Sequence, residues 1–349
     1  MRVHARSAWL LWLAAGAAPT LAADGPPPVD QRDYARPQQL IDIGGGRRMN
    51  LFCKGSGSPT VVFDSGTGLA GWDWLRVHPA IARKTRACVY DRPGFGFSDP
   101  SPRAGTSAHA VDDLHRLLTA ANVPPPYVLV GHSYGGMNVQ LYAYTHPQQV
   151  VGLVNVDGGH EDEAERFNRI TGGKFARLMA QYMAESAQCV AAAKTGISPG
   201  SAAFAQCIAE PPPMFGAPLA AAFLANKMSP AYWDAARSEE ESEATSSDQL
   251  RGARKSFGDL PLVYLTRGIS PFLVPGQPQG EMNKATERDV MAMHDEIARL
   301  STRGRNQLVP GAGHSIHVDK PQAVIDAINE VLGQVLGKVR STPQSGNRP

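Results

Sequence analysis

The sequence lacks the features with which proteins recognise nucleic acid or an anionic membrane surface. Its 34 Lys and Arg residues nearly balance its 32 Asp and Glu residues, which gives a formal net charge of +2. No segment concentrates the basic residues. Because binding to nucleic acid or anionic lipid needs a concentrated Lys/Arg surface, we expect neither as the main partner.

Cysteine is also scarce. The chain has only Cys53, Cys88, Cys189 and Cys207, and none of them lie in the Cys-x-x-Cys spacing of a structural zinc site. We therefore expect no metal. In an exported chain four cysteines allow three disulfide connectivities, and four free buried thiols are the alternative.

Apart from its start, the chain has no hydrophobic run that could cross a bilayer. Residues 8–18 are apolar, follow a basic start and lead to small residues ending at Ala23. This core is too short for a membrane span of about 20 residues, and the pattern is typical of a secretory signal peptide. We predict a signal peptide at 1–23, a periplasmic or secreted protein and no stable membrane insertion. An uncleaved amino-terminal anchor is the alternative.

The most informative segment is 127–137, where an apolar strand runs into Gly-His-Ser-Tyr-Gly and then a helix. Glycine permits the sharp reversal, because a side chain at Gly131 or Gly135 would collide with the neighbouring strand or helix. The turn exposes the Ser133 hydroxyl at the carboxyl end of the sheet, beside the first helix amides. Ser133 is therefore predicted as a nucleophile, and the Tyr134 amide as a donor to an oxyanion.

Strand-like and helix-like segments alternate along most of the chain, which predicts a parallel sheet. A break comes at 158–258, where helical spacings continue without a strand-like run. Within it, the acidic stretch 239–243 is expected to be a solvated helix face, and the polar tail 339–349 is expected to be disordered. Strands are expected at 39–43, 47–53, 60–63, 87–90, 127–130, 150–156, 262–265 and 307–309, and helices at 72–82, 111–118, 285–300 and 321–336.

Three motifs in this order along the chain carry a resemblance to a known family: the segment Asp-Arg-Pro-Gly-Phe-Gly-Phe-Ser at 91–98, the serine turn, and Gly-Ala-Gly-His at 311–314. Together they resemble the α/β-hydrolase superfamily with a cap domain. The resemblance implies an α/β fold whose eight-stranded, mostly parallel sheet is flanked by helices. It also implies a core at 37–157 and 259–338, with a helical cap at 158–258 inserted after the sixth strand.

The resemblance also implies a catalytic base. A serine hydroxyl needs an adjacent imidazole to take its proton, and His314 follows the last strand where the superfamily places its histidine. His317, three residues later, is the alternative. His132 adjoins the nucleophile, but its side chain is expected to point away from Ser133, so we interpret it as structural.

The acid is harder to place. Superfamily members commonly carry it after the strand matching 262–266, but here Arg267 follows, and the next carboxylate is Glu281. Asp259 precedes that strand and so lies at the wrong edge. Asp157 ends the strand at 150–156, beside the serine, where some superfamily members carry the acid. We predict that Asp157 orients the imidazole, with a helix-capping role as the alternative.

The loop after the third strand is expected to supply the second oxyanion donor. Residues 65–68 read Ser-Gly-Thr-Gly where the superfamily usually has His-Gly-x, which makes the Thr67 amide the candidate; a simple turn is the alternative. The resemblance places the strands of Cys53 and Cys88 side by side, which favours a disulfide between them. It leaves Cys189 and Cys207 to pair within the cap.

These features predict an exported serine hydrolase that cleaves a carboxylic ester through an acyl-enzyme, without a metal or organic cofactor. The apolar cap favours a small or medium, largely apolar ester substrate. Lactones, amides, peptides or carbon–carbon bonds could be cleaved by the same residues. A fold relative that binds a ligand without catalysis is the other alternative.

Overall fold

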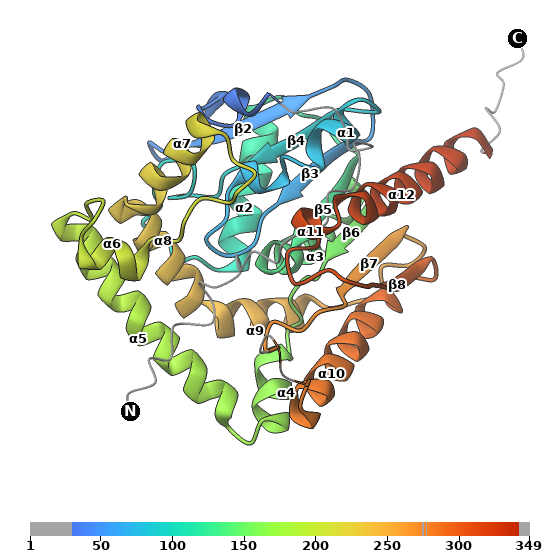
Figure 1. The fold of residues 1–349 in the computed structure, drawn as a ribbon. Helices are drawn as coiled ribbons and strands as arrows, with labels where there is room; N and C mark the ends of the chain where they lie inside the picture. The colour runs from blue at the N-terminus through green and yellow to red at the C-terminus, as the bar shows by residue number, and fades with distance from the viewer. Residues whose placement is uncertain (1–29, 274–275, 277, 342–349) are drawn as a thin grey trace, which may run out of the picture.

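The computed structural model describes residues 30–341 except 274–275 and 277. The predicted signal peptide and residues 342–349 of the tail lie outside this part of the chain. One eight-stranded sheet crosses the molecule in the order β1-β2-β4-β3-β5-β6-β7-β8 (Figure 1). Its strands are β1 Gln39–Asp42, β2 Arg48–Lys54, β3 Thr60–Asp64, β4 Ala87–Tyr90, β5 Tyr127–His132, β6 Val150–Val156, β7 Leu262–Arg267 and β8 Gly304–Val309.

The sheet is mostly parallel, as predicted. β1 and β2 form an antiparallel hairpin, and β2 also pairs antiparallel with β4, whereas the strands from β4 to β8 pair in parallel. All residues of β3, β5 and β7 are buried, because helices cover both faces of the sheet. In a parallel sheet the carboxyl ends of the strands share one edge, so β3, β5, β6 and β7 all deliver their following loops there.

Helices pack on both sides of the sheet, as Figure 1 shows. On one side lie α1 (His78–Ala82) and α12 (Pro321–Ser341), and on the other α2 (Ser107–Ala120), α3 (Tyr134–Thr145) and α10 (Glu281–Ala298). The short elements are η1 Gln31–Asp33, η2 Gly71–Trp74, η3 Pro147–Gln149 and α11 Ile316–Asp319.

Two expected segments differ from the structure. The single helix expected at 72–82 is instead the η2 turn followed by α1, since Pro79 has no N–H and fits only the first turn of a helix. The helix α12 continues through 339–341, into the tail that was expected to be disordered.

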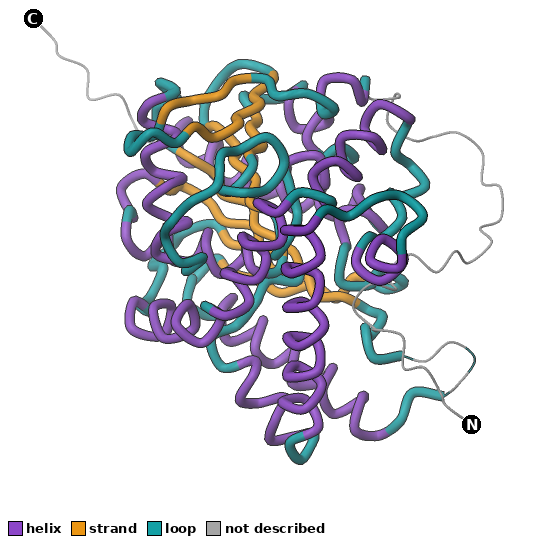
Figure 2. Tube along the Cα trace, turned by 90° about the vertical axis from the view of Figure 1, so that its left-hand side faces the viewer, coloured by secondary structure: helices purple, strands orange, loops and turns teal. Residues whose placement is uncertain are grey.

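The segment 158–258, all of which the structure describes, forms helices and no strand. Figure 1 labels these helices to one side of the sheet, and Figure 2, which views the molecule from its left-hand side, shows helices in front of the strands. The first five are α4 Glu163–Ile170, α5 Lys174–Thr195, α6 Ala202–Cys207, α7 Ala217–Lys227 and α8 Pro230–Glu241. The last, α9 (Glu243–Ala253), returns to the core and packs on α2 and α3. Across the described part of the chain, no helix is both long and apolar enough to cross a membrane.

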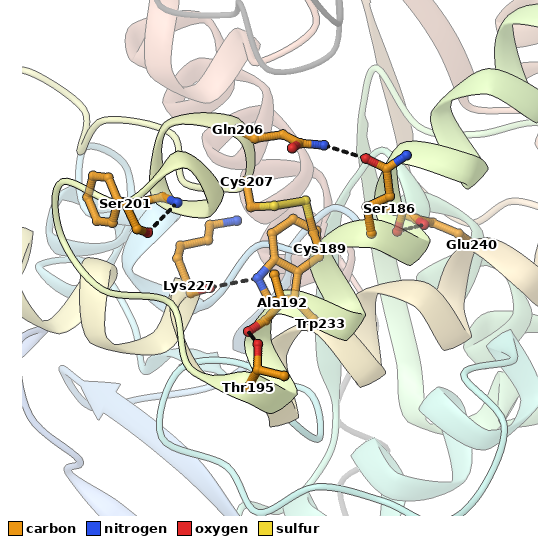
Figure 3. The surroundings of a disulfide bond; sticks show 12 residues. Ser186, Cys189, Ala192, Thr195, Ser201, Gln206, Cys207, Lys227, Trp233 and Glu240 are labelled. Atoms are coloured by element: carbon orange, nitrogen blue, oxygen red, sulfur yellow. Dashed lines mark hydrogen bonds between the residues drawn. A yellow bond between two sulfur atoms is a disulfide. The ribbon is translucent and has the colours of Figure 1, made fainter.

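Two disulfides link the chain, in the pairing that the resemblance implied. Cys53 and Cys88 lie directly opposite each other on β2 and β4. Cys189 on α5 is bonded to Cys207 on α6, which ties the two cap helices together (Figure 3).

The acidic stretch 239–243 is not a solvated helix face as a whole, and the prediction is wrong for its first members. Glu239 is 6% exposed and accepts hydrogen bonds from the Arg92 guanidinium at 2.6 and 3.0 Å. Arg92 also donates to Asp64, at the end of β3, at 2.6 Å. A buried charge needs a partner, and this buried network joins cap helix α8 to the turn that follows β4.

Candidate active site

Ser133 occupies a strained turn between β5 and α3. Its backbone has φ 54° and ψ −122°, a conformation that a residue with a side chain rarely adopts. A Cβ at Gly131 would lie 2.3 Å from the Gly135 carbonyl oxygen, and one at Gly135 would lie 2.4 Å from the Asp64 carbonyl oxygen. The sequence therefore needs glycine at both positions for the strand, the turn and the helix to approach each other this closely.

One cavity of about 380 Å³ brings the predicted site residues together. It is lined by the predicted nucleophile, base and acid, and by both predicted oxyanion donors. These five residues follow four different strands, β3, β5, β6 and β8, which end at the same edge of the sheet. The five are Thr67, Ser133, Tyr134, Asp157 and His314.

His314 and Asp157 are in direct contact. Nδ1 of His314 lies 2.6 Å from Oδ2 of Asp157. A carboxylate can only accept a hydrogen bond, so Nδ1 carries the proton and Nε2 is left as the basic nitrogen. The loop that holds His314 is fixed, because the Gly313 amide donates to Asp319 and the Ala312 carbonyl accepts from the amide of Gly268.

Asp157 is buried in a network that sequence reasoning missed. The residue is 2% exposed, and it accepts hydrogen bonds from the Arg267 amide at 3.0 Å and from the Arg267 guanidinium at 2.8 Å. Glu287 holds the other side of that guanidinium. Burial acts to raise the pKa of Asp157, but the Arg267 charge and the hydrogen bond from His314 outweigh burial and hold this pKa well below its usual range. Asp157 is thus ionised at neutral pH.

A signal for Arg267 was present in the sequence. It is a charged residue at the end of an apolar strand, in the position where the superfamily commonly has its acid. A buried charge at such a place requires an opposite charge nearby, and Asp157 supplies it from the adjacent strand.

The two other histidines near the serine take different places. His317 is 1% exposed, with its ring centroid 4.6 Å from that of Trp74, and it lines a different cavity. Burial lowers the pKa of His317 to about 3, so it stays neutral. His132 is buried with its ring centroid 4.7 Å from that of His314, and its Nε2 lies 3.1 Å from the His314 carbonyl oxygen. His132 thus packs against His314 and lines the same cavity as Ser133.

The loop after β3, which is predicted to hold an oxyanion, lies against Ser133. Thr67 and Gly68 form the corner of a turn closed by a 3.1 Å hydrogen bond from the Leu69 amide to the Gly66 carbonyl, and Gly68 has φ +68°. A Cβ at Gly66 would lie 3.2 Å from Cβ of Ser133. Such a close approach is what a backbone donor to an oxyanion beside Ser133 requires.

Both candidate donor amides are available. Neither the Thr67 amide nor the Tyr134 amide donates to another residue in the described part of the chain. The Tyr134 side chain is anchored elsewhere, since its hydroxyl donates to the Gly105 carbonyl at 2.7 Å. The cavity therefore offers two backbone N–H groups beside a serine and a histidine–carboxylate pair.

Comparison with known proteins gives partial sequence matches. Residues 61–327 match the model of the alpha/beta hydrolase family. The uncharacterized protein YqjL of Bacillus subtilis is 36% identical over 104 residues, which are 30% of this chain and 41% of YqjL. The candidate carbamate hydrolase RutD of Serratia proteamaculans is 40% identical over 102 residues, 29% of this chain and 38% of RutD. The chain thus matches less than half the length of either relative.

Solved structures share the fold. A candidate lipase from Acinetobacter baumannii superposes with a TM-score of 0.63 at 18% identity, covering 88% of this chain and 95% of that one. An esterase from Thermogutta terrifontis gives a TM-score of 0.53 at 19% identity, covering 86% and 99%. The family model spans most of the chain, and the sheet, the serine turn and the loops follow in the order described above. This protein therefore belongs to the alpha/beta hydrolase family.

Proposed function

We propose that this protein is an exported serine hydrolase that cleaves a carboxylic ester through an acyl-enzyme. The observation that carries the proposal is one cavity lined both by Ser133, on its strained turn, and by a histidine that is paired with a buried, ionised carboxylate. A nucleophile, a base and an orienting acid are the groups that acyl transfer requires. The Thr67 and Tyr134 amides donate to no described residue, and both residues line the same cavity, which supports their role as oxyanion donors.

In the proposed reaction, Nε2 of His314 takes the hydroxyl proton as Oγ of Ser133 attacks the ester carbonyl carbon. The Thr67 and Tyr134 amides hold the resulting oxyanion. When the intermediate collapses, the carbon–oxygen bond to the alcohol breaks, and His314 gives its proton to the departing alcohol. Water then attacks the acyl-enzyme with His314 as the base, which releases the carboxylic acid and restores Ser133. Asp157 stabilises the imidazolium throughout without taking its proton.

The cavity supports a small or medium substrate with an apolar part. Its volume is about 380 Å³, and part of its wall is formed by Phe167, Phe175, Met179 and Phe272. Aromatic rings and a flexible methionine suit an acyl or alcohol group of variable shape. The ester chemistry of the solved relatives named above is consistent with this choice, and the two disulfides are compatible with export to an oxidising compartment.

Hydrolysis of p-nitrophenyl esters of graded acyl length tests the proposal. We expect turnover by the wild type and a loss of about 10⁴-fold or more in kcat for Ser133→Ala and for His314→Ala. His109→Ala, which replaces a histidine on α2 outside this cavity, is the matched control and should be unaffected. A lactone and an aryl amide in the same assay separate ester hydrolysis from the other reactions open to these residues. Absence of turnover by folded protein would favour a binding role instead.

A further inference from the structure

Arg92 is buried next to the site without lining its cavity. It belongs to the segment 91–98 that carried the family resemblance, and the proposed reaction gives it no role. Its side chain is 3% exposed, and it is not among the described residues that line the cavity around Ser133. A guanidinium has five N–H donors. All five donors of Arg92 are used by described acceptors, so the groups that it binds are fixed relative to one another.

Three of the five hydrogen bonds go to carboxylates. Nε and Nη2 of Arg92 donate to the two carboxylate oxygens of Glu239 at 2.6 and 3.0 Å, and Nη1 donates to Asp64 at 2.6 Å. Glu239 belongs to cap helix α8, and Asp64 ends β3. The carboxylates neutralise the buried charge, and the bidentate pair with Glu239 fixes the plane of the guanidinium.

The other two donors of Arg92 reach the loop after β3. Nη1 also donates to the Ser65 carbonyl, and Nη2 donates to the Gly66 carbonyl at 2.8 Å. The Gly66 carbonyl accepts a second hydrogen bond from the Leu69 amide at 3.1 Å. A carbonyl oxygen has two lone pairs, and both are thus used. The peptide unit between Gly66 and Thr67 is therefore held firmly on its carbonyl side.

The same peptide unit supplies the candidate oxyanion donor of Thr67. This peptide bond is trans, and in a trans peptide the C=O and the N–H point in opposite directions. Because the Gly66 carbonyl is turned towards Arg92, the Thr67 N–H is directed away from Arg92. A Cβ at Gly66 would lie 3.2 Å from Cβ of Ser133, so this peptide lies close to the nucleophile. A cation bound to the carbonyl also polarises the peptide and makes its N–H a stronger donor.

Arg92 contacts the residue of the second candidate donor as well. Its guanidinium carbon lies 5.4 Å from the centroid of the Tyr134 ring, within the range of a cation–π interaction. The hydroxyl at the far end of that ring is held by the Gly105 carbonyl. One buried cation thus contacts both segments that carry the candidate oxyanion donors.

We propose that Arg92 is a positioning residue for the oxyanion site, which holds the Gly66–Thr67 peptide so that the Thr67 amide faces the oxyanion formed at Ser133. Arg92 itself contacts neither the substrate nor the reacting atoms. The inference rests on the proposed acyl transfer and adds a residue to it. Because Glu239 fixes the guanidinium, cap helix α8 also helps to orient this donor, although the donor lies in the core.

Arg92→Lys tests the proposal, because lysine keeps the charge but has three donors for five acceptors. Its ammonium should stay with the two carboxylates and leave the Gly66 carbonyl. We expect kcat on a p-nitrophenyl ester to fall about 10²-fold, as for the loss of one oxyanion donor, with KM changed by less than about 3-fold. Arg47→Lys is the matched control, since the Arg47 side chain is 13% exposed and makes two hydrogen bonds to Asp113 outside this cavity.

A measurement on the oxyanion itself separates positioning from loss of structure. A trifluoromethyl ketone adds Oγ of Ser133 to its carbonyl carbon, and the oxygen of the resulting hemiketal takes the place of the ester oxyanion. Fluorine NMR follows the pH at which this oxygen ionises. A well-placed donor favours the ionised form, so the hemiketal of Arg92→Lys should ionise at least about 1 pH unit higher than those of the wild type and Arg47→Lys.

A second variant is available if Arg92→Lys does not fold. Arg92→Met/Glu239→Met removes both charges of the buried pair together, a change that proteins often tolerate. It leaves the Gly66 carbonyl without the guanidinium, so we expect the same fall in kcat and the same rise in the pH of hemiketal ionisation.

A folded variant with wild-type kcat and wild-type hemiketal ionisation would overturn the proposal, and Arg92 would then only link the cap to the core. The esterase proposal would remain intact. If the wild type neither hydrolyses esters nor forms the hemiketal, the esterase proposal fails, and crystal structures of wild type and variant decide the role of Arg92. A Gly66–Thr67 peptide that is rotated in the variant supports positioning, and an unchanged peptide contradicts it.

Discussion

The Asp157 carboxylate accepts two hydrogen bonds from Arg267, one from the backbone amide at 3.0 Å and one from the guanidinium at 2.8 Å. This pair joins the end of β6 to the end of β7, and the same carboxylate oxygen that meets the guanidinium also meets His314. The position of the His314 ring and the stability of this sheet edge therefore depend on one buried ion pair.

Replacing Arg267 should destabilise the fold in a pH-dependent way. In Arg267→Met the Asp157 charge stays buried without its cation, so we expect the free energy of unfolding to fall by about 3–5 kcal/mol at pH 7. The wild-type pKa of Asp157 is depressed, so its stabilisation is complete above the unfolded pKa of about 3.9 and is lost as pH falls below it. In the variant Asp157 binds a proton at higher pH, so the difference between the two proteins should shrink towards pH 4.

Urea unfolding at pH 7 and pH 4 measures this difference. Arg305→Met is the matched control, because the Arg305 side chain is 40% exposed in its pair with Glu330. An exposed pair contributes about 0–1 kcal/mol. An effect of Arg267→Met no larger than that of Arg305→Met would show that the buried pair does not stabilise the site.

The acid can be tested against its alternative. Asp157→Asn should lower kcat about 10⁴-fold on a p-nitrophenyl ester with little change in KM, because an amide cannot hold the same imidazole tautomer or stabilise the imidazolium. Glu281→Gln should leave both constants unchanged, since Glu281 is an exposed partner of Lys284 at the start of α10. Near-normal turnover by Asp157→Asn would show that Asp157 is not the acid that orients His314.

The turn at the nucleophile should tolerate no side chain at Gly135. A Cβ there would lie 2.4 Å from the Asp64 carbonyl oxygen, so Gly135→Ala must shift β3 or α3. It should lower the midpoint of thermal unfolding and the rate at which a serine-reactive fluorophosphonate probe labels Ser133. Gly333→Ala places the same methyl group in open space on α12 and should stabilise by roughly 0.5–1 kcal/mol. Similar behaviour of the two variants in calorimetry would contradict the packing at the turn.

The cap disulfide should stabilise the helical insertion. Cys189 and Cys207 are 18 residues apart in sequence, and a closed loop of that length contributes about 3 kcal/mol by restricting the unfolded chain. We expect Cys207→Ser to lower the midpoint of thermal unfolding, with the Ser133 probe reaction retained in the folded variant. A midpoint equal to the wild type would indicate that the helices hold together without the bond.

The sequence predicted much of the fold because the elements that define it carry local signals. The apolar strand before Ser133, the paired glycines and the late glycine-rich loop of His314 each impose a backbone shape that few residues permit. Asp157 was predicted from its place at the end of a strand. The alternation of strands and helices along the chain gives strand order and register only through the family resemblance.

What the sequence did not predict depends on contacts between distant segments. Arg267 and Asp157 are 110 residues apart, and Arg92 and Glu239 are 147 apart. A local pattern cannot show which opposite charge a buried residue contacts. Glu239 was therefore predicted to be solvated, and Arg267 was noted only as the residue at the position where the superfamily commonly has its acid.

The central claim is that Ser133 is an activated nucleophile, and reaction with a fluorophosphonate probe tests it most directly. Intact mass and peptide mapping should show one phosphonyl group per chain, on Ser133, with labelling absent in Ser133→Ala and strongly slowed in His314→Ala. Folded wild-type protein that stays unlabelled, or that is labelled at another residue, would contradict the account.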